Sequence, residues 1–147
     1  MTITVFGIPG PQGSKSRGRY GQLYESSKKV KPWREACKYA ALEVIENEGL
    51  NNRRRIYGAA ISGPVEVEIS FSLPSPQSRK KIDRYPSRKP DIDKLLRSTF
   101  DGLSDIRVWE DDARVVRVLA RKLYVGEMGA LESPGAFIIV NSVWVNH

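Results

Sequence analysis

Apolar and polar residues alternate strictly from Val65 to Leu73, and this stretch constrains the fold more than any other. Successive side chains of a β-strand point to opposite faces, so the alternation assigns each residue to one of two faces. The other face carries two glutamates and two serines. The pattern predicts a strand with one face on the core and one in solvent. The core-facing side chains are Val65, Val67, Ile69, Phe71 and Leu73.

One helical pattern precedes this strand in the sequence, and another follows it. The first predicted helix is capped by Ser26 or Ser27, and it ends at Gly49. Its apolar residues recur at steps of three and four, which defines one buried stripe. The stripe contains Trp33, Cys37, Ala40, Ala41, Val44 and Ile45. The second predicted helix starts near Pro90-Asp91, and its stripe contains Ile92, Leu95, Leu96, Thr99, Phe100 and Leu103.

Three further strands are predicted at residues 3–8, 115–125 and 136–145, whereas residues 104–109 fit either a turn or a strand. The resulting order is β-α-β-α-β-β. It predicts an α/β or α+β fold, with a single mixed sheet of about four strands packed against two helices. We expect one domain spanning residues 1–147, with mobile basic loops near 10–30 and 74–90.

Histidine and cysteine are almost missing, and this excludes several kinds of site. The chain has one His, the terminal His147, and one Cys, Cys37. A Ser-His-Asp triad, a His general base and a zinc site are therefore disfavoured. Cys37 lies in the apolar stripe of the first helix, which favours a core position. One cysteine cannot form an internal disulfide, and this fits a reducing cytoplasm.

No targeting or membrane segment is recognisable. The first twenty residues lack a basic region followed by an apolar one. No run approaches the roughly 20 apolar residues of a membrane helix. We therefore expect no membrane partner and a cytoplasmic location.

The basic residues are clustered. The chain has 24 Lys and Arg residues against 17 Asp and Glu residues, a formal net charge of +7. Three segments, 11–34, 53–55 and 79–89, together carry +14, so the remainder carries −7. A positive loop that contains an aromatic residue, here Tyr85, suits a phosphate backbone and a stacked base. Solvated loops that keep a protein soluble have the same composition, so charge alone leaves nucleic-acid binding open.

Seven acidic residues fall within positions 91–112, directly after the most basic loop. If four of them converge, two carboxylates about 6 Å apart repel by roughly 3 kcal/mol at an effective dielectric of ~20. A divalent cation offsets such repulsion, and Mg²⁺ prefers oxygen ligands. A carboxylate–Mg²⁺ site between basic loops suits phosphodiester hydrolysis. The four residues are Asp91, Asp93, Asp111 and Asp112.

Simpler roles explain part of this pattern. Asp91 at a helix N-cap and Asp93 in the first turn would satisfy unpaired N–H groups and the helix dipole. Arg97 lies four residues after Asp93 and four before Asp101, the spacing of a surface ion-pair ladder. The alternative is that Arg97 or Lys94 points at the scissile phosphate. Spacing slightly favours the ladder.

Three motifs follow one another between Pro90 and Tyr124. Asp91-Ile92-Asp93 opens the second predicted helix, and Phe100-Asp101-Gly102-Leu103 lies on it. Trp109-Glu110-Asp111-Asp112, with Val115 after it, precedes a predicted strand. This order of D-x-D, F-D-x-L and W-x-D-D-x-x-V resembles the RusA family of Holliday junction resolvases. The opening strand, the segment 11–17 and the helix with Trp33 extend the resemblance more loosely.

The resemblance implies a homodimeric, Mg²⁺-dependent endodeoxyribonuclease that cuts two strands of a four-way DNA junction symmetrically, with Mn²⁺ as a possible substitute. Such enzymes act in DNA recombination and repair and are typical of phages and prophages, so the resemblance also implies a location at the nucleoid of a bacterial or phage-infected cell. A C₂ dimer would present two equal sites to a junction that is roughly two-fold symmetric. By motif match, Asp91, Asp93 and Asp112 are the essential metal-binding aspartates, and Asp111 is the adjacent acid of the same pocket.

The family's catalytic basic residue, a lysine one helical turn after D-x-D, is matched by Arg97. Arginine keeps the positive charge but has no accessible neutral form, so charge stabilisation survives and proton transfer is in doubt. Lys94, from the preceding turn, is the substitute we consider. Both residues are therefore catalytic candidates.

The leading hypothesis is thus a junction-resolving endonuclease whose partners are four-way junction DNA and a second copy, without a nucleotide cofactor. Two alternatives stay open: a DNA-binding phage protein without catalysis, and a Mg²⁺-dependent nuclease for flaps or other branched DNA. The candidate DNA contacts are Lys15, Arg17, Arg19, Arg79, Lys80, Lys81, Arg84, Tyr85, Arg88 and Lys89.

Overall fold

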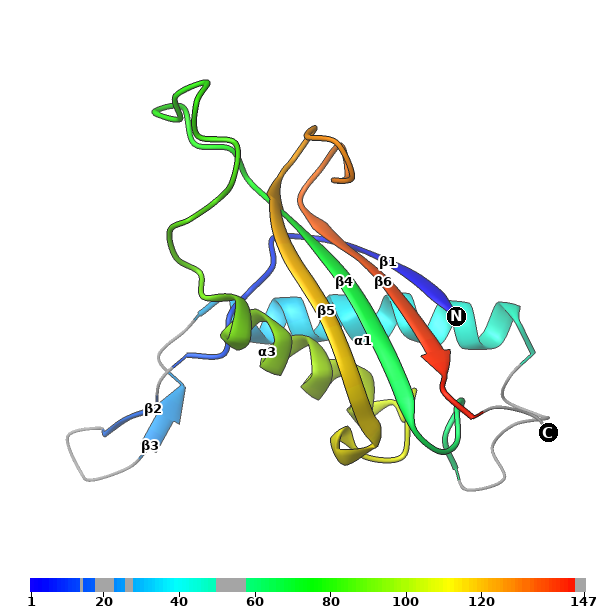
Figure 1. The fold of residues 1–147 in the computed structure, drawn as a ribbon. Coiled ribbons are helices and arrows are strands. Elements are labelled where there is room, and N and C mark those ends of the chain that lie inside the picture. Colours follow the sequence, from blue (N-terminus) through cyan, green and yellow to red (C-terminus); the bar gives the residue numbers. More distant parts are fainter. Residues whose placement is uncertain (14, 18–22, 26–27, 50–57, 145–147) are drawn as a thin grey trace.

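Four strands form one mixed sheet in the order β1-β6-β4-β5 (Figure 1). A computed structural model describes residues 1–13, 15–17, 23–25, 28–49 and 58–144. The strands are β1 (Thr2–Phe6), β4 (Val65–Leu73), β5 (Val115–Tyr124) and β6 (Gly135–Ser142). β4 pairs in parallel with β5 and antiparallel with β6, which in turn pairs antiparallel with β1. The predicted α+β fold with one mixed four-stranded sheet and two helices is confirmed.

Both helices, α1 (Val30–Asn47) and α3 (Ile92–Asp105), lie on the same face of the sheet (Figure 1). The apolar stripes predicted for the two helices explain this arrangement. Their residues Trp33, Cys37, Leu95 and Leu103 are all buried in one core with the apolar residues of β4. Gly102 lets the helices approach closely. A Cβ there would lie 3.0 Å from the carbonyl oxygen of Arg34, tighter than ordinary contacts.

The segment before α1 differs from the expected loop. It contains a small antiparallel pair, β2 (Lys15–Arg17) and β3 (Leu23–Glu25), which sequence patterning missed. Three-residue strands are too short to show the alternation on which strand prediction depends. The proposed caps Ser26 and Ser27 lie outside the described residues, and Lys29 occupies the N-cap position of α1. Gly49, with φ +65°, follows the end of α1 as predicted.

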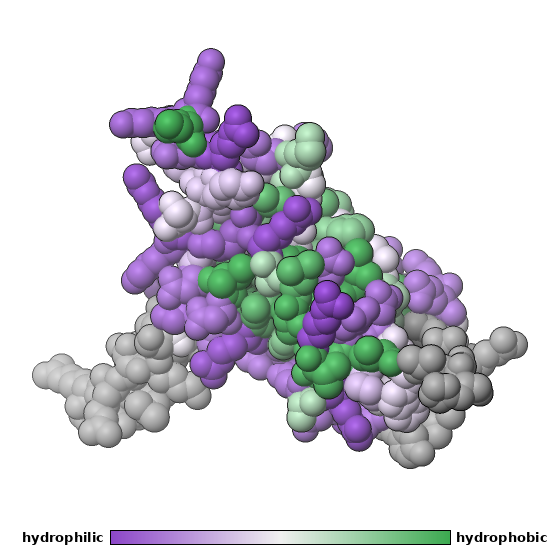
Figure 2. Space-filling model, viewed as in Figure 1, coloured by the Kyte–Doolittle hydropathy of each residue, from purple (hydrophilic) through white to green (hydrophobic). Residues whose placement is uncertain are grey.

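The uncovered face of the sheet is less solvated than the sequence predicts. Glu68 is exposed, but Ser70 and Ser72 are buried. Ser72 Oγ accepts a hydrogen bond of 2.9 Å from the amide of Leu131, and Ser70 Oγ accepts one of 2.8 Å from Arg121. The β5–β6 connection and the side chains of β5 therefore cover this end of β4. Figure 2 shows hydrophobic and hydrophilic residues side by side on this face.

The remaining boundaries follow the prediction to within a few residues. β5 ends at Tyr124 and β6 at Ser142, whereas residues 104–109 form no strand but contribute a single bridge between Trp109 and Ile61. In the described part of the chain, no helix is long and apolar enough to cross a membrane.

Candidate active site

The first turn of α3 carries the two carboxylates of the D-x-D motif. Asp91 occupies the N-cap position, as predicted, but its side chain makes no capping hydrogen bond. Its Oδ2 lies 3.9 Å from Nζ of Lys94, three residues on. Asp93, in the first turn, is exposed. The capping role that would explain Asp91 structurally is therefore not performed by its carboxylate, which faces Lys94.

The acidic turn before β5 gives each of its acids a separate local partner. Asp111 Oδ1 accepts a hydrogen bond of 2.8 Å from the amide of Ala113 and so caps the short 3₁₀ helix η1 (Asp112–Arg114). Asp112 Oδ1 accepts one of 2.9 Å from Nε1 of Trp109. Glu110 pairs with Arg114 at 2.9 Å. Successive acids are tolerated in this turn because their charges are directed to different donors.

Asp112 lies near Asp101, in the C-terminal half of α3. Burial raises the pKa of Asp101, and the nearby carboxylates of Asp112 and Asp105 raise it further, while Arg34 opposes them. Asp101 is ten residues beyond Asp91, about 15 Å along a helix axis. Within the described residues, no three His, Cys, Asp or Glu side chains gather into a group that could hold a metal. The described residues therefore do not show the convergence of four aspartates that was supposed from the sequence.

Arg97 is exposed and does not form the predicted ladder. In the part of the chain that the structure describes, it makes no ion pair within 4.0 Å with Asp93 or Asp101. Asp101 instead pairs with Arg34 of α1, with 3.2 Å between Nη2 and Oδ2. The positive charge of Arg97 nevertheless lowers the pKa of Asp101, so the two groups are close enough to interact. Arg97 therefore remains available to a ligand.

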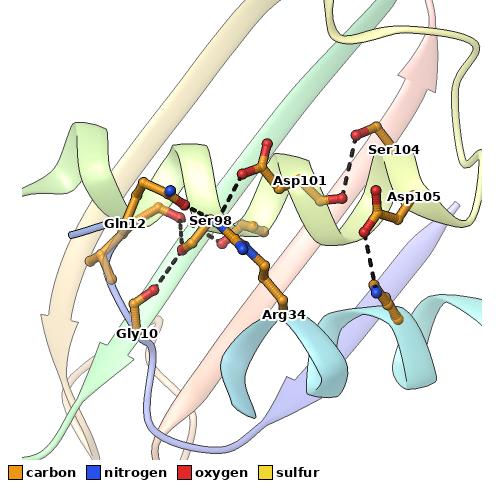
Figure 3. A network of polar contacts seen from close by, with 10 residues as sticks. Gly10, Gln12, Arg34, Ser98, Asp101, Ser104 and Asp105 are labelled. Atoms are coloured by element: carbon orange, nitrogen blue, oxygen red, sulfur yellow. Dashed lines mark hydrogen bonds and ion pairs between the residues drawn. The ribbon is translucent and has the colours of Figure 1, made fainter. Parts of the chain in front are cut away.

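A network of hydrogen bonds and an ion pair connects residues 10–12, at the start of the basic N-terminal segment, to α3 (Figure 3). Arg34 donates from Nη2 to both Gln12 Oε1 and Asp101 Oδ2. The backbone N–H of Gln12 donates a hydrogen bond of 2.9 Å to the backbone carbonyl of Lys94. Ser98 Oγ donates to the carbonyl of Gly10 at 2.6 Å. These contacts place residues 10–12 beside the helix that carries Asp93 and Arg97.

The 74–90 loop ends at the candidate site. Lys122 of β5 donates from Nζ to the carbonyls of Arg88 and Pro90, both at 2.9 Å, and so holds the end of the loop next to Asp91. Arg79 makes contacts within the chain. Its guanidinium stacks 4.3 Å from the centroid of the Tyr124 ring and pairs with Glu127. The other candidate contacts on this loop are exposed: Lys80, Lys81, Arg84, Tyr85, Arg88 and Lys89.

Three candidate DNA contacts belong to the segment before α1. Lys15 and Arg17 are the first and last residues of β2, so the β2–β3 pair carries both. Arg19 lies outside the described residues, as does the basic triplet 53–55.

Sequence reasoning did not select four residues that organise the site. Trp109 anchors Asp112, Arg34 and Gln12 join the N-terminal segment to α3, and Lys122 holds the 74–90 loop. Trp109 was visible as part of the W-x-D-D motif. Arg34 and Lys122 looked like two more basic residues, because their partners are distant in sequence.

The family model described as "Endodeoxyribonuclease RusA" matches residues 7–132, which begin directly after β1 and include every element from β2 through β5. The chain belongs to the RusA endodeoxyribonuclease family. The match extends well beyond the three motifs and includes the N-terminal segment that packs on α3. A curated relative from Bacillus subtilis (strain 168), named "Uncharacterized protein YqaN", is 27% identical over 140 residues, covering 86% of this chain and 89% of the relative. This RusA-family chain is therefore an endodeoxyribonuclease at the level of its family.

Proposed function

We propose that the chain is a Mg²⁺-dependent endonuclease that resolves four-way DNA junctions in recombination and repair. One observation carries the proposal: the Asp91 carboxylate stands at the start of α3 without capping it, directly after a loop rich in exposed Lys and Arg. Acidic side chains beside a DNA-binding surface repel the phosphates unless a bound cation offsets their negative charge or they take part in the reaction. RusA-family membership supplies the nuclease class.

The carboxylates offer suitable ligands for Mg²⁺. Carboxylate oxygens are the donors this ion prefers, and one or two of them commonly suffice when waters and substrate phosphate complete the octahedron. We propose Asp91 and Asp93 as metal ligands at the start of α3. Asp112, with Asp111 adjacent, lies near Asp101, about 15 Å along the helix from Asp91, and in this proposal it joins the same ion only when metal and DNA bind. Asp93 has no hydrogen bond or ion pair among the described residues, so no internal partner has to be displaced. Mn²⁺ has the same ligand preference and is the expected substitute.

Each part of the chain then has a distinct task. When bound, Mg²⁺ would activate a water and stabilise the charge that develops on the phosphate. Arg97, unpaired among the described residues, would bind a non-bridging phosphate oxygen with its planar fork. Lys94 would hold Asp91 from the next turn. Trp109 would orient the Asp112 carboxylate, leaving Oδ2 outside that hydrogen bond.

We also propose that the active form is a homodimer. A four-way junction is roughly two-fold symmetric, and paired cuts need two equal sites related by a two-fold axis. The basic segments would bind the arms, with the β2–β3 pair and the 74–90 loop on opposite sides of the α3 N-terminus (Figure 1). Sedimentation of the chain alone and with junction DNA checks the stoichiometry of two chains per junction.

A cleavage assay tests the proposal. Synthetic four-way junctions, flaps and plain duplexes of matched sequence are offered with Mg²⁺, with Mn²⁺ and with a chelator. We expect symmetric paired nicks in the junction alone, dependent on metal. Cleavage of flaps at the same rate would instead indicate a general branched-DNA nuclease. Tight junction binding without cleavage, and without thermal stabilisation by Mg²⁺, would indicate a DNA-binding protein and overturn the proposal.

A further inference from the structure

A cavity of about 730 Å³ opens beside Asp91. Its walls come from the N-terminal segment 8–13, the 74–90 loop and the first turn of α3, and Leu73 and Tyr124 lie at its base. Pockets that enclose small organic groups measure about 300–1,000 Å³, so this cavity has the size of a ligand site. It is larger than a phosphate contact requires, and the roles proposed above leave it unused.

The walls of the cavity are apolar and rigid. Six prolines line it, and a proline ring fixes φ, so these walls lose little conformational freedom on binding. Tyr124 is held in place by the Arg79 guanidinium stacked on its ring and by its burial. Ile8, in contrast, is half-exposed at the edge. The prolines are Pro9, Pro11, Pro74, Pro76, Pro86 and Pro90.

The rim of the cavity is positively charged. Four cations line it, and Asp91 is the single acid among the described lining residues. An apolar interior with a cationic rim matches a group that has a flat, weakly polar ring attached to a phosphate. A nucleotide whose base has left the duplex stack has this chemistry. The cations are Lys29, Arg88, Lys89 and Lys94.

We propose that this cavity receives one unstacked nucleobase of the DNA strand being cut, next to the junction's exchange point. The base would lie between the proline walls, and the phosphates on either side would contact the rim cations. Lys94 and Asp91 belong both to this rim and to the candidate site, so the captured nucleotide would set which phosphate reaches Asp91. This inference rests on the proposed function, because it assumes a DNA strand at Asp91.

A fluorescent base analogue tests the cavity directly. 2-Aminopurine brightens when it leaves the stack, and it is placed singly at each position within two nucleotides of the exchange point of a four-way junction. Fluorescence is read with the chelator present, so that binding is observed without cleavage, and binding itself is measured by anisotropy. With the wild-type chain we expect one position on the strand to brighten several-fold at saturation.

Two cavity-filling variants and one control complete the design. Ile8→Trp and Pro76→Trp add bulk from two different segments of the lining, the N-terminal segment and the 74–90 loop. Both positions are half-exposed or exposed, so folding should survive. Met128→Trp adds the same bulk on the β5–β6 connection, 95% exposed and outside the cavity. We expect brightening to be lost in both cavity variants and kept in Met128→Trp, each read at a chain concentration that saturates junction binding in its own anisotropy titration.

The outcomes separate this inference from the proposed function. Metal-dependent cleavage by the wild type with no brightening at any position would overturn the base pocket and leave the nuclease in place. Brightening that both cavity variants retain would also overturn it. Brightening that the variants abolish, without cleavage in Mg²⁺, would support the pocket while refuting the nuclease. A chain that does not bind the junction would refute both.

Discussion

Nε1 of Trp109 donates a hydrogen bond of 2.9 Å to Oδ1 of Asp112. The indole is fully buried and meets the Phe100 ring edge to face, with 5.3 Å between centroids. The carboxylate, three residues on, belongs to an exposed residue in the turn before β5. The hydrophobic core thus orients an acid that faces solvent, as the proposed role of Asp112 as a metal ligand requires.

This relationship predicts a specific effect of Trp109→Phe. The variant loses the hydrogen bond to Asp112, and we expect cleavage to fall roughly 10–100-fold, the usual cost of removing a group that orients a metal ligand. The matched control is Trp33→Phe, because Trp33 is equally buried and donates to Thr99 Oγ1 at 3.0 Å, away from the acids. Single-turnover rates and urea unfolding measure both effects. Equal rate losses at equal stability loss would contradict the orienting role.

Replacing the proposed ligands should separate chemistry from binding. Asp91→Asn and Asp112→Asn each remove a metal-binding charge but leave the basic loops intact. We expect cleavage to fall by about 10²–10³-fold or more, while junction affinity stays nearly unchanged. Asp105→Asn, on the same helix and paired with Lys38, is the isosteric control and should cleave normally. Cleavage by Asp91→Asn at the wild-type rate would refute the metal assignment.

Arg97 is expected to act through its charge. Arg97→Ala should lower the cleavage rate by about 10²-fold, with little loss of binding, because one group contacting the developing phosphate charge is removed. Arg97→Lys keeps the charge and should stay within a few-fold of wild type. The pH–rate profile of Arg97→Lys is the second measurement, because a lysine that transfers a proton adds a titration that arginine lacks. An Arg97→Ala enzyme with unchanged rate would exclude this role.

The exposed cations of the 74–90 loop should contribute to the salt dependence of junction binding. The double variant Lys80→Gln/Lys81→Gln is expected to reduce the slope of log affinity against log salt by about 0.9 for each DNA phosphate that the lysines neutralise in the wild type. Lys38→Gln is the control, since Lys38 lies on α1 and pairs with Glu35 and Asp105. Its slope should match that of wild type. Anisotropy titrations over a range of salt concentrations measure all three slopes, and an unchanged slope in the double variant would remove these lysines from the interface.

Cys37 should be unreactive in the folded chain. Burial raises the pKa of its thiol from 9.0 to about 12, with a hydrogen bond to Thr99 acting in the opposite direction. The thiolate is therefore disfavoured at pH 8, and the free energy of unfolding should fall as pH rises from about 9 toward 12. A thiol reagent such as DTNB should label Cys37 only after unfolding in urea. Rapid labelling of the native chain would contradict its core position.

Local periodicity was sufficient for most of the fold. The alternation from Val65 to Leu73 predicted the bounds of β4 without error, and the apolar stripes predicted both helices that cover it. Each pattern is contained in a short stretch of chain, and the hydrophobic effect is non-directional, so burial of one face follows from sequence spacing. The β2–β3 pair and the burial of Ser70 and Ser72 were missed. They depend on short pairings and on a covering connection from elsewhere in the chain.

For the candidate site, too, some features followed from the sequence and others only from the tertiary structure. The sequence alone determined that Asp91 and Asp93 begin a helix after a basic loop, and that an acidic turn precedes β5. Only the tertiary structure decided that Asp112 lies by Asp101, and that Arg34 pairs with Asp101 across 67 residues of sequence instead of leaving it to Arg97. The physical reason is that hydrogen bonds and ion pairs require contact at about 3 Å in a set direction. Such placement follows from how α1, α3 and the sheet pack together, and no spacing within one segment encodes it.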